Sequence, residues 1–260
     1  MSNSLQGKKL VIVGGTTGLG LSAARAFVKE GASVVIVGRS AENSTAAIEL
    51  LGATARSLVA DASTPTTAIT AIELALKHFG GFDGLYHVAG GSGRQRGDGP
   101  VAEISDEGWE FTLRLNLDSI FYSNRAAIRQ FLKQGHGGTI LNMGSVLSFS
   151  PSPEFFTTHA YAAAKAAIVG MTQSAASYYA PRNIRLNVIA PALVETPMSG
   201  RAQQNPAIMQ FIKNKQPLDG GRIGVPSDLD AAAVFFMSDA SRFVTGQVLA
   251  VDGGWSVSEG

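Results

Sequence analysis

The sequence contains no cysteine. Disulfide bonds, thiol nucleophiles and cysteine-ligated metals are therefore excluded, and we expect no metal site. An excess of either charge is also missing, because 21 Lys and Arg side chains oppose 20 Asp and Glu side chains. Surfaces that bind nucleic acid or anionic membranes carry a basic excess, so neither kind of partner is expected.

Long apolar runs are missing as well. No uncharged stretch approaches the length of a membrane span. The first residues, "MSNSLQGKKLVIVGG", contain only a short apolar run before glycines, which is typical of a first strand and not of a signal peptide. Together with the missing cysteine, these features predict a cytoplasmic protein.

What the chain has is an alternation of β-rich and helical runs. Hydrophobic residues make up 45% of it, and no repeat or linker divides residues 1–260, so a single domain is expected. The predicted strands are rich in Val, Ile and Leu without clean alternation, as in strands covered on both faces; they span 9–13, 33–37, 55–60, 84–89, 138–143, 184–190 and 247–251. Helical runs separate them, one of them a long amphipathic helix over 106–135. This pattern predicts an α/β fold with a doubly wound, seven-stranded parallel sheet, whose ligands bind at the carboxyl ends of the strands.

A glycine-rich loop, "VGGTTGLG", follows the first predicted strand and opens a helix. Gly14, Gly18 and Gly20 permit positive φ angles and a close backbone approach, and the helix N-terminus attracts a phosphate. A tight turn without a ligand explains the glycines alone, but the strand before and the helix after favour a dinucleotide site.

The second predicted strand ends in Gly38 and Arg39, where an NAD site would have a carboxylate for the ribose hydroxyls. An arginine there pairs with the 2′-phosphate of NADP, to which Ser40 could add a hydroxyl. An ordinary surface arginine is the alternative, so NADP is preferred over NAD but not established. Asp61, after the third strand, is either a partner of the adenine amino group or a helix cap.

Four polar residues are candidates for catalysis. Tyr161 and Lys165, in "YAAAK", lie four residues apart on one helix face. A nearby ammonium, helped by an oxidised nicotinamide, would favour the phenolate and could lower the tyrosine pKa toward about 7. Ser145 follows the fifth strand and could bond a substrate oxygen. Asn116, within the long helix, could support a proton relay or shape the helix. Each alone could be a surface residue or a cap.

Taken together and in this order, the motifs resemble those of the short-chain dehydrogenase/reductase family. The resemblance spans nearly the whole chain and rests on "GGTTGLG", "AGG" at 89–91, Asn116, Ser145, "YAAAK", "NVIAPALVETPM" and "GQVLAVDGGW". It implies a Rossmann-type fold, a nicotinamide cofactor, and assembly as a homotetramer or homodimer. It also implies that Tyr161 is the general acid/base, Lys165 the ribose ligand that lowers its pKa, Ser145 the carbonyl or alkoxide stabiliser, and Asn116 the relay support.

The glycine-rich loop and the family resemblance together imply one set of cofactor-binding residues. They are Gly14, Thr16, Thr17, Gly18, Leu19, Gly20, Arg39, Ser40, Asp61, Ala62, Ala89, Gly90, Tyr161, Lys165, Pro191, Val194 and Thr196. In the last segment, the Val194 backbone is expected at the nicotinamide carboxamide, with the Thr196 hydroxyl nearby.

The sequence departs from the family pattern at His87, where an asparagine is usual. Neutral histidine also has one donor and one acceptor, so we expect a hydrogen-bonded core residue rather than a proton relay. The substrate loops are expected at 90–100, 149–159 and 197–218. Arg94 and Arg96 in the first could face an anionic substrate or be solvated charges.

The sequence thus predicts an NADP(H)-dependent enzyme that interconverts a carbonyl compound and an alcohol. The alternative is a sensor that binds the cofactor without turnover; the complete set of Ser145, Tyr161 and Lys165 disfavours it. A phosphate-loop NTPase is excluded, because no Gly-Lys-Ser/Thr follows the glycine loop.

Overall fold

The computed structural model describes residues 3–259. Its centre is one seven-stranded, all-parallel sheet in the order β3-β2-β1-β4-β5-β6-β7. The strands are β1 Lys9–Val13, β2 Ser33–Gly38, β3 Ala55–Val59, β4 Gly84–His87, β5 Gly138–Met143, β6 Ile184–Pro191 and β7 Val248–Val251. The central strands β1, β4 and β5 are buried except for the first residue of β1 and of β5, which explains their continuous Val, Ile and Leu runs. The predicted fold class is confirmed.

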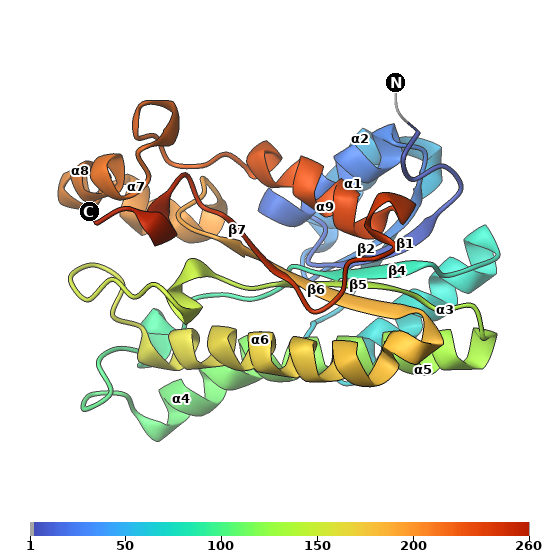
Figure 1. Cartoon of the computed structure of the whole chain (residues 1–260), viewed down its shortest axis with the longest axis horizontal. Coiled ribbons are helices and arrows are strands. Elements are labelled where there is room, and N and C mark those ends of the chain that lie inside the picture. The colour runs from blue at the N-terminus through green and yellow to red at the C-terminus, as the bar shows by residue number, and fades with distance from the viewer. Residues whose placement is uncertain (1–2, 260) are drawn as a thin grey trace.

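Helices cover both faces of this sheet (Figure 1). Within residues 3–259 they are α1 Gly18–Lys29, α2 Ala41–Leu51, α3 Thr67–Phe79, α4 Asp106–Leu113, α5 Ser119–Gln134, α6 His159–Tyr179, α7 Gly200–Gln203, α8 Pro206–Lys215 and α9 Asp230–Met237. Figure 1 shows α1, α2 and α9 on one side and α3, α5 and α6 on the other. Each layer closes its own hydrophobic core, with Phe27 on the first side and Phe82 and Phe131 on the second. In the part of the chain that the structure describes, no helix is long and apolar enough to cross a membrane.

The prediction of one continuous α-helix over 106–135 is wrong in one respect. A π-helical turn, Arg114–Asp118, separates α4 from α5. The wider turn places one extra residue in the helix, and such turns are common at functional sites. Asn116 lies in it and is fully buried.

The three predicted substrate loops lie at one end of the molecule. They follow the carboxyl ends of β4, β5 and β6, because all strands of a parallel sheet point the same way. Figure 1 shows them with α4, α7 and α8 on the side away from the N-terminus.

Candidate active site

The chain order of the sheet reverses between β1 and β4, which is where open α/β sheets form a binding crevice at the carboxyl ends of their strands. The loops that leave these strands touch: a Cβ on Gly14 would lie 2.6 Å from the Ala89 nitrogen. The same loops are held in place because the Val13 carbonyl accepts the N–H groups of Val88 and Ala89. This is the position at which open α/β sheets bind nucleotides.

The glycine-rich loop has the shape of a phosphate cradle. Gly14 has a φ of +88° and Gly18 a φ of +50°, and a Cβ on Gly20 would lie 2.0 Å from the Gly14 carbonyl oxygen. Thr17 occupies the N-cap of α1 but its side chain caps no amide, so the first N–H groups of the helix are available. Thr16 is buried beneath the loop, whereas Leu19 packs against the core. These residues therefore fit a pyrophosphate at the helix N-terminus.

At the end of β2, the exposed Arg39 side chain makes no hydrogen bond or ion pair within the described residues. Asp61 lies close enough for its pKa to be affected by Arg39. Burial alone would raise that pKa, but hydrogen bonds from the N–H and hydroxyl of Ser63, together with the charge of Arg39, leave it below its usual value. Ser40 caps α2 by accepting the Asn43 N–H at 3.2 Å, and Ala62 follows Asp61 on the way to α3. The positive side chain of Arg39 and the negative side chain of Asp61 therefore lie near each other after the carboxyl ends of β2 and β3.

Gly38 packs directly against Thr16. A Cβ at position 38 would lie 2.2 Å from the Thr16 hydroxyl oxygen. The packing of Thr16 therefore requires a glycine here, because no larger residue would fit.

The segment after β6, which contains Thr196, contacts the glycine-rich loop. The Thr196 side chain lies 3.4 Å from the position a Cβ would take on Gly18. Ser199 holds the turn, because its hydroxyl donates to the Val194 carbonyl at 2.7 Å and accepts the Thr196 N–H at 3.0 Å. With Pro191 buried at the end of β6, the predicted residues of this segment border the same crevice.

Three of the four candidate catalytic residues meet at the carboxyl edge of β5. The Lys165 ammonium lies 5.5 Å from the centre of the Tyr161 ring and donates to the Met143 carbonyl at 2.8 Å. Ser145, two residues beyond Met143, lies near Tyr161, because its hydroxyl lowers the pKa of the Tyr161 side chain. Two hydroxyl groups and a buried ammonium therefore share one site.

Burial acts against ionisation of both Tyr161 and Lys165. It raises the pKa of Tyr161 to about 12, and the Ser145 hydroxyl opposes this shift only in part. Burial also lowers the pKa of Lys165 to about 7. The chain alone therefore does not reach the expected tyrosine pKa of about 7, which stays a prediction for the site with an oxidised nicotinamide bound.

Asn116 supports the loop after β4. Its amide group donates to the Gly91 carbonyl at 2.9 Å and accepts the Gly91 N–H at 3.0 Å, so it bonds the backbone of one residue in both directions. A Cβ on Gly90 would lie 2.8 Å from Asn116 Oδ1 and 3.6 Å from Lys165 Nζ. Asn116 and Lys165 therefore face the same glycine from two helices.

His87 is a buried, hydrogen-bonded residue, as its chemistry suggested. Its Nε2 lies 3.1 Å from the Ala89 carbonyl oxygen and its Nδ1 lies 2.9 Å from the Ser123 hydroxyl. A carbonyl only accepts, so Nε2 carries the proton and Nδ1 accepts from Ser123. The ring thus holds the loop that contains Ala89 and Gly90.

The sequence did not reveal Asp98. Its buried carboxylate accepts the backbone N–H of Ala160 and of Tyr161, both at 3.0 Å, and so caps α6 from the loop after β4. His159 strengthens the junction by accepting the Val101 N–H at 3.0 Å. The sequence shows only that Asp98 is an acidic residue in the loop over 90–100. The amides that it caps lie more than sixty residues further along the chain.

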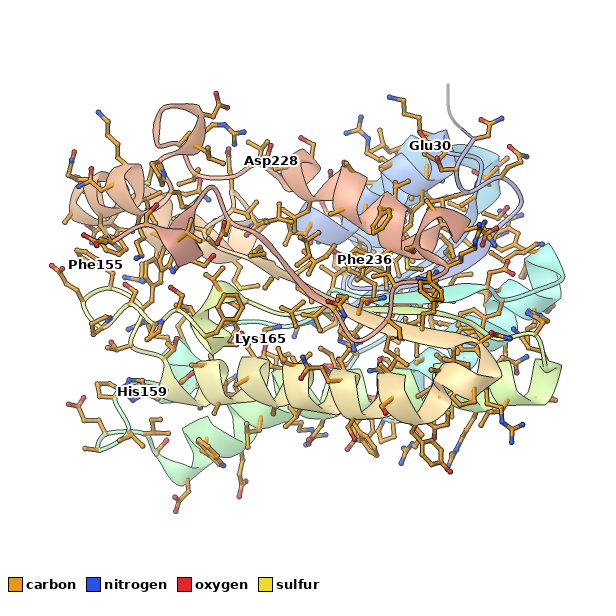
Figure 2. All side chains as sticks on the ribbon, in the orientation of Figure 1. Glu30, Phe155, His159, Lys165, Asp228 and Phe236 are labelled. Atoms are coloured by element: carbon orange, nitrogen blue, oxygen red, sulfur yellow. The ribbon has the colours of Figure 1, made fainter. Side chains whose placement is uncertain are left out.

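The second and third substrate loops pack together through aromatic rings. Phe155 lies 5.2 Å from Phe211, and Phe156 lies 5.7 Å from Trp255 between ring centres. Ile208 and Ile212 of α8 are fully buried in the same cluster, whereas Met198 stays exposed. Figure 2 shows Phe155 and His159 at the same end of the molecule as Lys165.

This geometry agrees with comparisons to known proteins. A family model described as enoyl-(acyl carrier protein) reductase matches residues 13–256. The 2-dehydro-3-deoxy-D-gluconate 5-dehydrogenase of Dickeya dadantii is 36% identical over 97% of this chain and 96% of its own. The 3beta-hydroxysteroid dehydrogenase 1 of Eggerthella lenta is 35% identical over 100% of this chain and 98% of its own.

Solved structures match equally well. A short-chain type dehydrogenase/reductase from Mycobacterium ulcerans superposes with a TM-score of 0.89 at 29% identity, covering 98% of this chain and 92% of its own. Because the relatives are named dehydrogenases and reductases, nothing among them supports a sensor without turnover. The chain belongs to the short-chain dehydrogenase/reductase family and is an NAD(P)-dependent oxidoreductase.

Proposed function

We propose that this enzyme reduces a carbonyl compound to an alcohol with NADPH, and that Tyr161 is its general acid. The observation that carries the proposal is that Tyr161, Ser145 and Lys165 lie together, with Lys165 next to Gly90 in the loop that touches Gly14 through Ala89. Burial raises the pKa of Tyr161 to about 12, so in the chain without cofactor this side chain holds the proton that a general acid donates.

In this mechanism the chain handles the proton and the substrate oxygen. The cofactor, when bound in the crevice, supplies the hydride to the carbonyl carbon. Tyr161 transfers its hydroxyl proton to the carbonyl oxygen as negative charge develops there, while the Ser145 hydroxyl donates a hydrogen bond to the same oxygen. The Lys165 ammonium, fixed by the Met143 carbonyl, stabilises the phenolate that remains. Asn116 keeps the loop that carries Gly90 in place.

The test is a screen of ketones and alcohols with NADPH and with NADH, using wild type and Tyr161→Phe. The substitution removes one hydroxyl, and loss of a general acid lowers the rate about 10²–10⁴-fold. Cofactor binding, followed by nicotinamide fluorescence, should persist. A variant that keeps the wild-type kcat would refute the role of Tyr161.

Preference for NADP rests on Arg39, which is exposed, unpaired within residues 3–259, and placed at the end of β2. A charge-assisted hydrogen bond of about 1.5–3 kcal/mol corresponds to about 10- to 150-fold in affinity. Arg39→Ala should weaken NADPH by about this factor and leave NADH nearly unchanged. Arg182→Ala, an exposed arginine after α6, is the control. Equal weakening of both cofactors would show that Arg39 stacks on the adenine, and the NADP assignment would be wrong.

We also propose that the enzyme is a homo-oligomer that pairs through α5 and α6. Phe121 on α5 and Tyr178 on α6 are large apolar residues exposed to solvent. Among residues 3–259, the buried Asn124 amide finds no hydrogen-bond partner for either of its polar atoms. A second copy would cover these groups, giving a dimer or tetramer. Light scattering at micromolar concentration tests the proposal, and a monomer would refute it.

A further inference from the structure

Gln216 is a buried glutamine at the end of α8, in the third substrate loop. Only 2% of its surface is exposed. Its side-chain amide accepts the Leu193 N–H at 3.0 Å and donates to the Leu193 carbonyl at 3.2 Å, so it bonds one residue in both directions. The pair of bonds also defines the orientation of the amide, since an N–H needs an oxygen and a carbonyl needs an NH2 group. A residue of a substrate loop therefore holds the segment that follows β6.

A second contact fixes the same segment from another part of the chain. The Leu193 carbonyl also accepts the Gly224 N–H at 3.0 Å, and the Gly224 carbonyl accepts the Glu195 N–H at 2.8 Å. Val194 and Gly224 thus form an isolated parallel bridge. The Leu193 N–H differs, because within residues 3–259 the Gln216 side chain is its only acceptor. Gln216 therefore makes a bond to this segment that the bridge does not replace.

Val194 lies between Leu193 and Glu195 and turns its backbone the other way. In a parallel bridge the neighbours on either side bond the partner, and the residue between them directs its own N–H and C=O away from it. The Val194 carbonyl accepts the Ser199 hydroxyl at 2.7 Å. Its N–H finds no acceptor in the part of the chain that the structure describes, although the residue is buried. A buried amide without a partner is costly unless a bound group accepts from it.

This amide belongs to a segment that borders the glycine-rich loop. Two residues further on, the Thr196 side chain lies 3.4 Å from the position of a Cβ on Gly18, at the start of α1. The segment also follows the carboxyl end of β6, and parallel sheets bind their ligands at these strand ends. The unpaired N–H of Val194 therefore agrees with the expectation that this backbone binds the nicotinamide carboxamide.

Packing between two substrate loops places Gln216. Ile208 and Ile212 of α8 are fully buried in a cluster that includes Phe155 of the loop after β5. The Gln216 N–H completes the last turn of this helix by donating to the Ile212 carbonyl at 2.7 Å. The location of Gln216, and of the segment that it holds, is therefore tied to the packing of α8 on the loop after β5.

We propose that Gln216 is a positioning residue for hydride transfer: it sets the place of Leu193 and Val194, and through them that of the nicotinamide. This inference rests on the proposed function and adds to it a residue that acts through the backbone of its neighbours. Reacting groups keep a productive geometry only when supporting hydrogen bonds fix the residues that hold them. A nicotinamide displaced by about 1 Å would lower the rate of hydride transfer about 100-fold.

Gln216→Met provides the kinetic test, because methionine has nearly the same length but offers no N–H or C=O group. The variant should reduce the carbonyl compounds that wild type reduces, with kcat lower by about 10- to 100-fold. The factor should be the same for each compound, since the defect lies at the cofactor and not in the substrate pocket. Gln210→Met, at an exposed glutamine of the same helix, is the matched control and should keep the wild-type kcat. A factor that differs widely between compounds would show that Gln216 shapes the substrate pocket, and would overturn the proposal.

A binding measurement needs no turnover. Calorimetry compares the cofactor that wild type prefers, NADPH or NADH, with the same molecule lacking nicotinamide, which is 2′-phospho-ADP-ribose or ADP-ribose. Gln216→Met should weaken the complete cofactor about 2- to 12-fold, which is the value of one hydrogen bond, and leave the molecule without nicotinamide unchanged. A purely structural role would change both affinities alike or neither, and either result would overturn the proposal.

The outcomes separate this inference from the proposed function. If wild type reduces no carbonyl compound but Gln216→Met still weakens only the complete cofactor, the reductase function fails and the role of Gln216 at the nicotinamide stands. If kcat and both affinities match wild type, the role of Gln216 fails and the reductase function stands. Should Gln216→Met not fold, Gln216→Glu decides by the same comparison. It keeps an acceptor for the Leu193 N–H, loses only the donor to the Leu193 carbonyl, and should show the same selective weakening.

Discussion

The Asp98 carboxylate accepts the backbone N–H of Tyr161 at 3.0 Å, and thereby joins the loop after β4 to the helix that carries the proposed general acid. Asp98 touches none of the reacting atoms, so it is a positioning residue. Asp98→Ala removes the acceptor for two amides of α6, and loss of an N-cap costs about 0.5–2 kcal/mol. We expect the variant to unfold more easily and to lose kcat, since Tyr161 is no longer fixed.

Two further variants separate positioning from general stability. Asp98→Asn and Asp98→Ser keep a side-chain oxygen and should restore much of the kcat of the alanine variant. Asp106→Ala removes an exposed acid at the start of α4 and should change neither stability nor kcat. If Asp98→Ala lowers stability but keeps the wild-type kcat in the folded state, Asp98 does not position Tyr161.

The contact between Gly38 and Thr16 limits the attempt to change the cofactor preference by substituting Gly38. An acid at the end of β2 would ordinarily favour NAD, but the Thr16 side chain fills the space that a Cβ on Gly38 needs. Overpacking of this kind costs about 1–3 kcal/mol. Gly38→Asp and Gly38→Ala should therefore both destabilise the protein, measured by denaturant unfolding. A stable Gly38→Asp variant with a clean preference for NADH would contradict the packing.

The fold could be predicted from the sequence because it follows from local patterns. Continuous Val and Ile runs identified the strands, and the glycines at 14, 18 and 20 identified the turn before α1. The candidate catalytic residues were assigned together because their motifs, in this order, resemble those of the short-chain dehydrogenase/reductase family. Asp98 and the Gly38–Thr16 contact could not be found in this way, since each depends on residues that are distant in sequence and meet only when the loops pack. The burial that raises the pKa of Tyr161 could not be predicted either, because the spacing of Tyr161 and Lys165 reports their distance and not their burial.

Lys165 should make stability depend on pH in the alkaline range. Burial lowers its pKa from 10.5 to about 7, so the unfolded chain binds more protons than the native protein between these values. Stability therefore rises as pH increases across this window, by up to about 1.4 kcal/mol per pH unit. Lys165→Met should flatten this slope in urea unfolding between about pH 7.5 and 9.5. Lys133→Met, an exposed lysine of α5, should keep the slope, and a Lys165→Met slope equal to wild type would disprove the shift.

His87 should make the protein sensitive to acid. Burial, together with the nearby charge of Lys165, lowers the pKa of His87 from 6.5 to about 3. The folded protein keeps the ring neutral, since Nε2 donates to the Ala89 carbonyl and Nδ1 accepts from Ser123. The unfolded chain gains a proton as pH falls below 6.5, so this contribution to stability is complete above pH 6.5 and is lost as pH falls toward 3.

A histidine-to-asparagine exchange tests this link, because an amide also offers a donor and an acceptor but does not titrate. His87→Asn should lose less stability than wild type between about pH 6.5 and 4, with the slopes differing by up to about 1.4 kcal/mol per pH unit. Denaturant unfolding at several pH values measures both slopes. His136→Asn, at an exposed histidine after α5, controls for the loss of a histidine as such and should follow wild type. If His87→Asn has the same acid slope as wild type, the ring is not held neutral, and its hydrogen bonds to Ala89 and Ser123 do not fix the loop beside Gly90 in the way described.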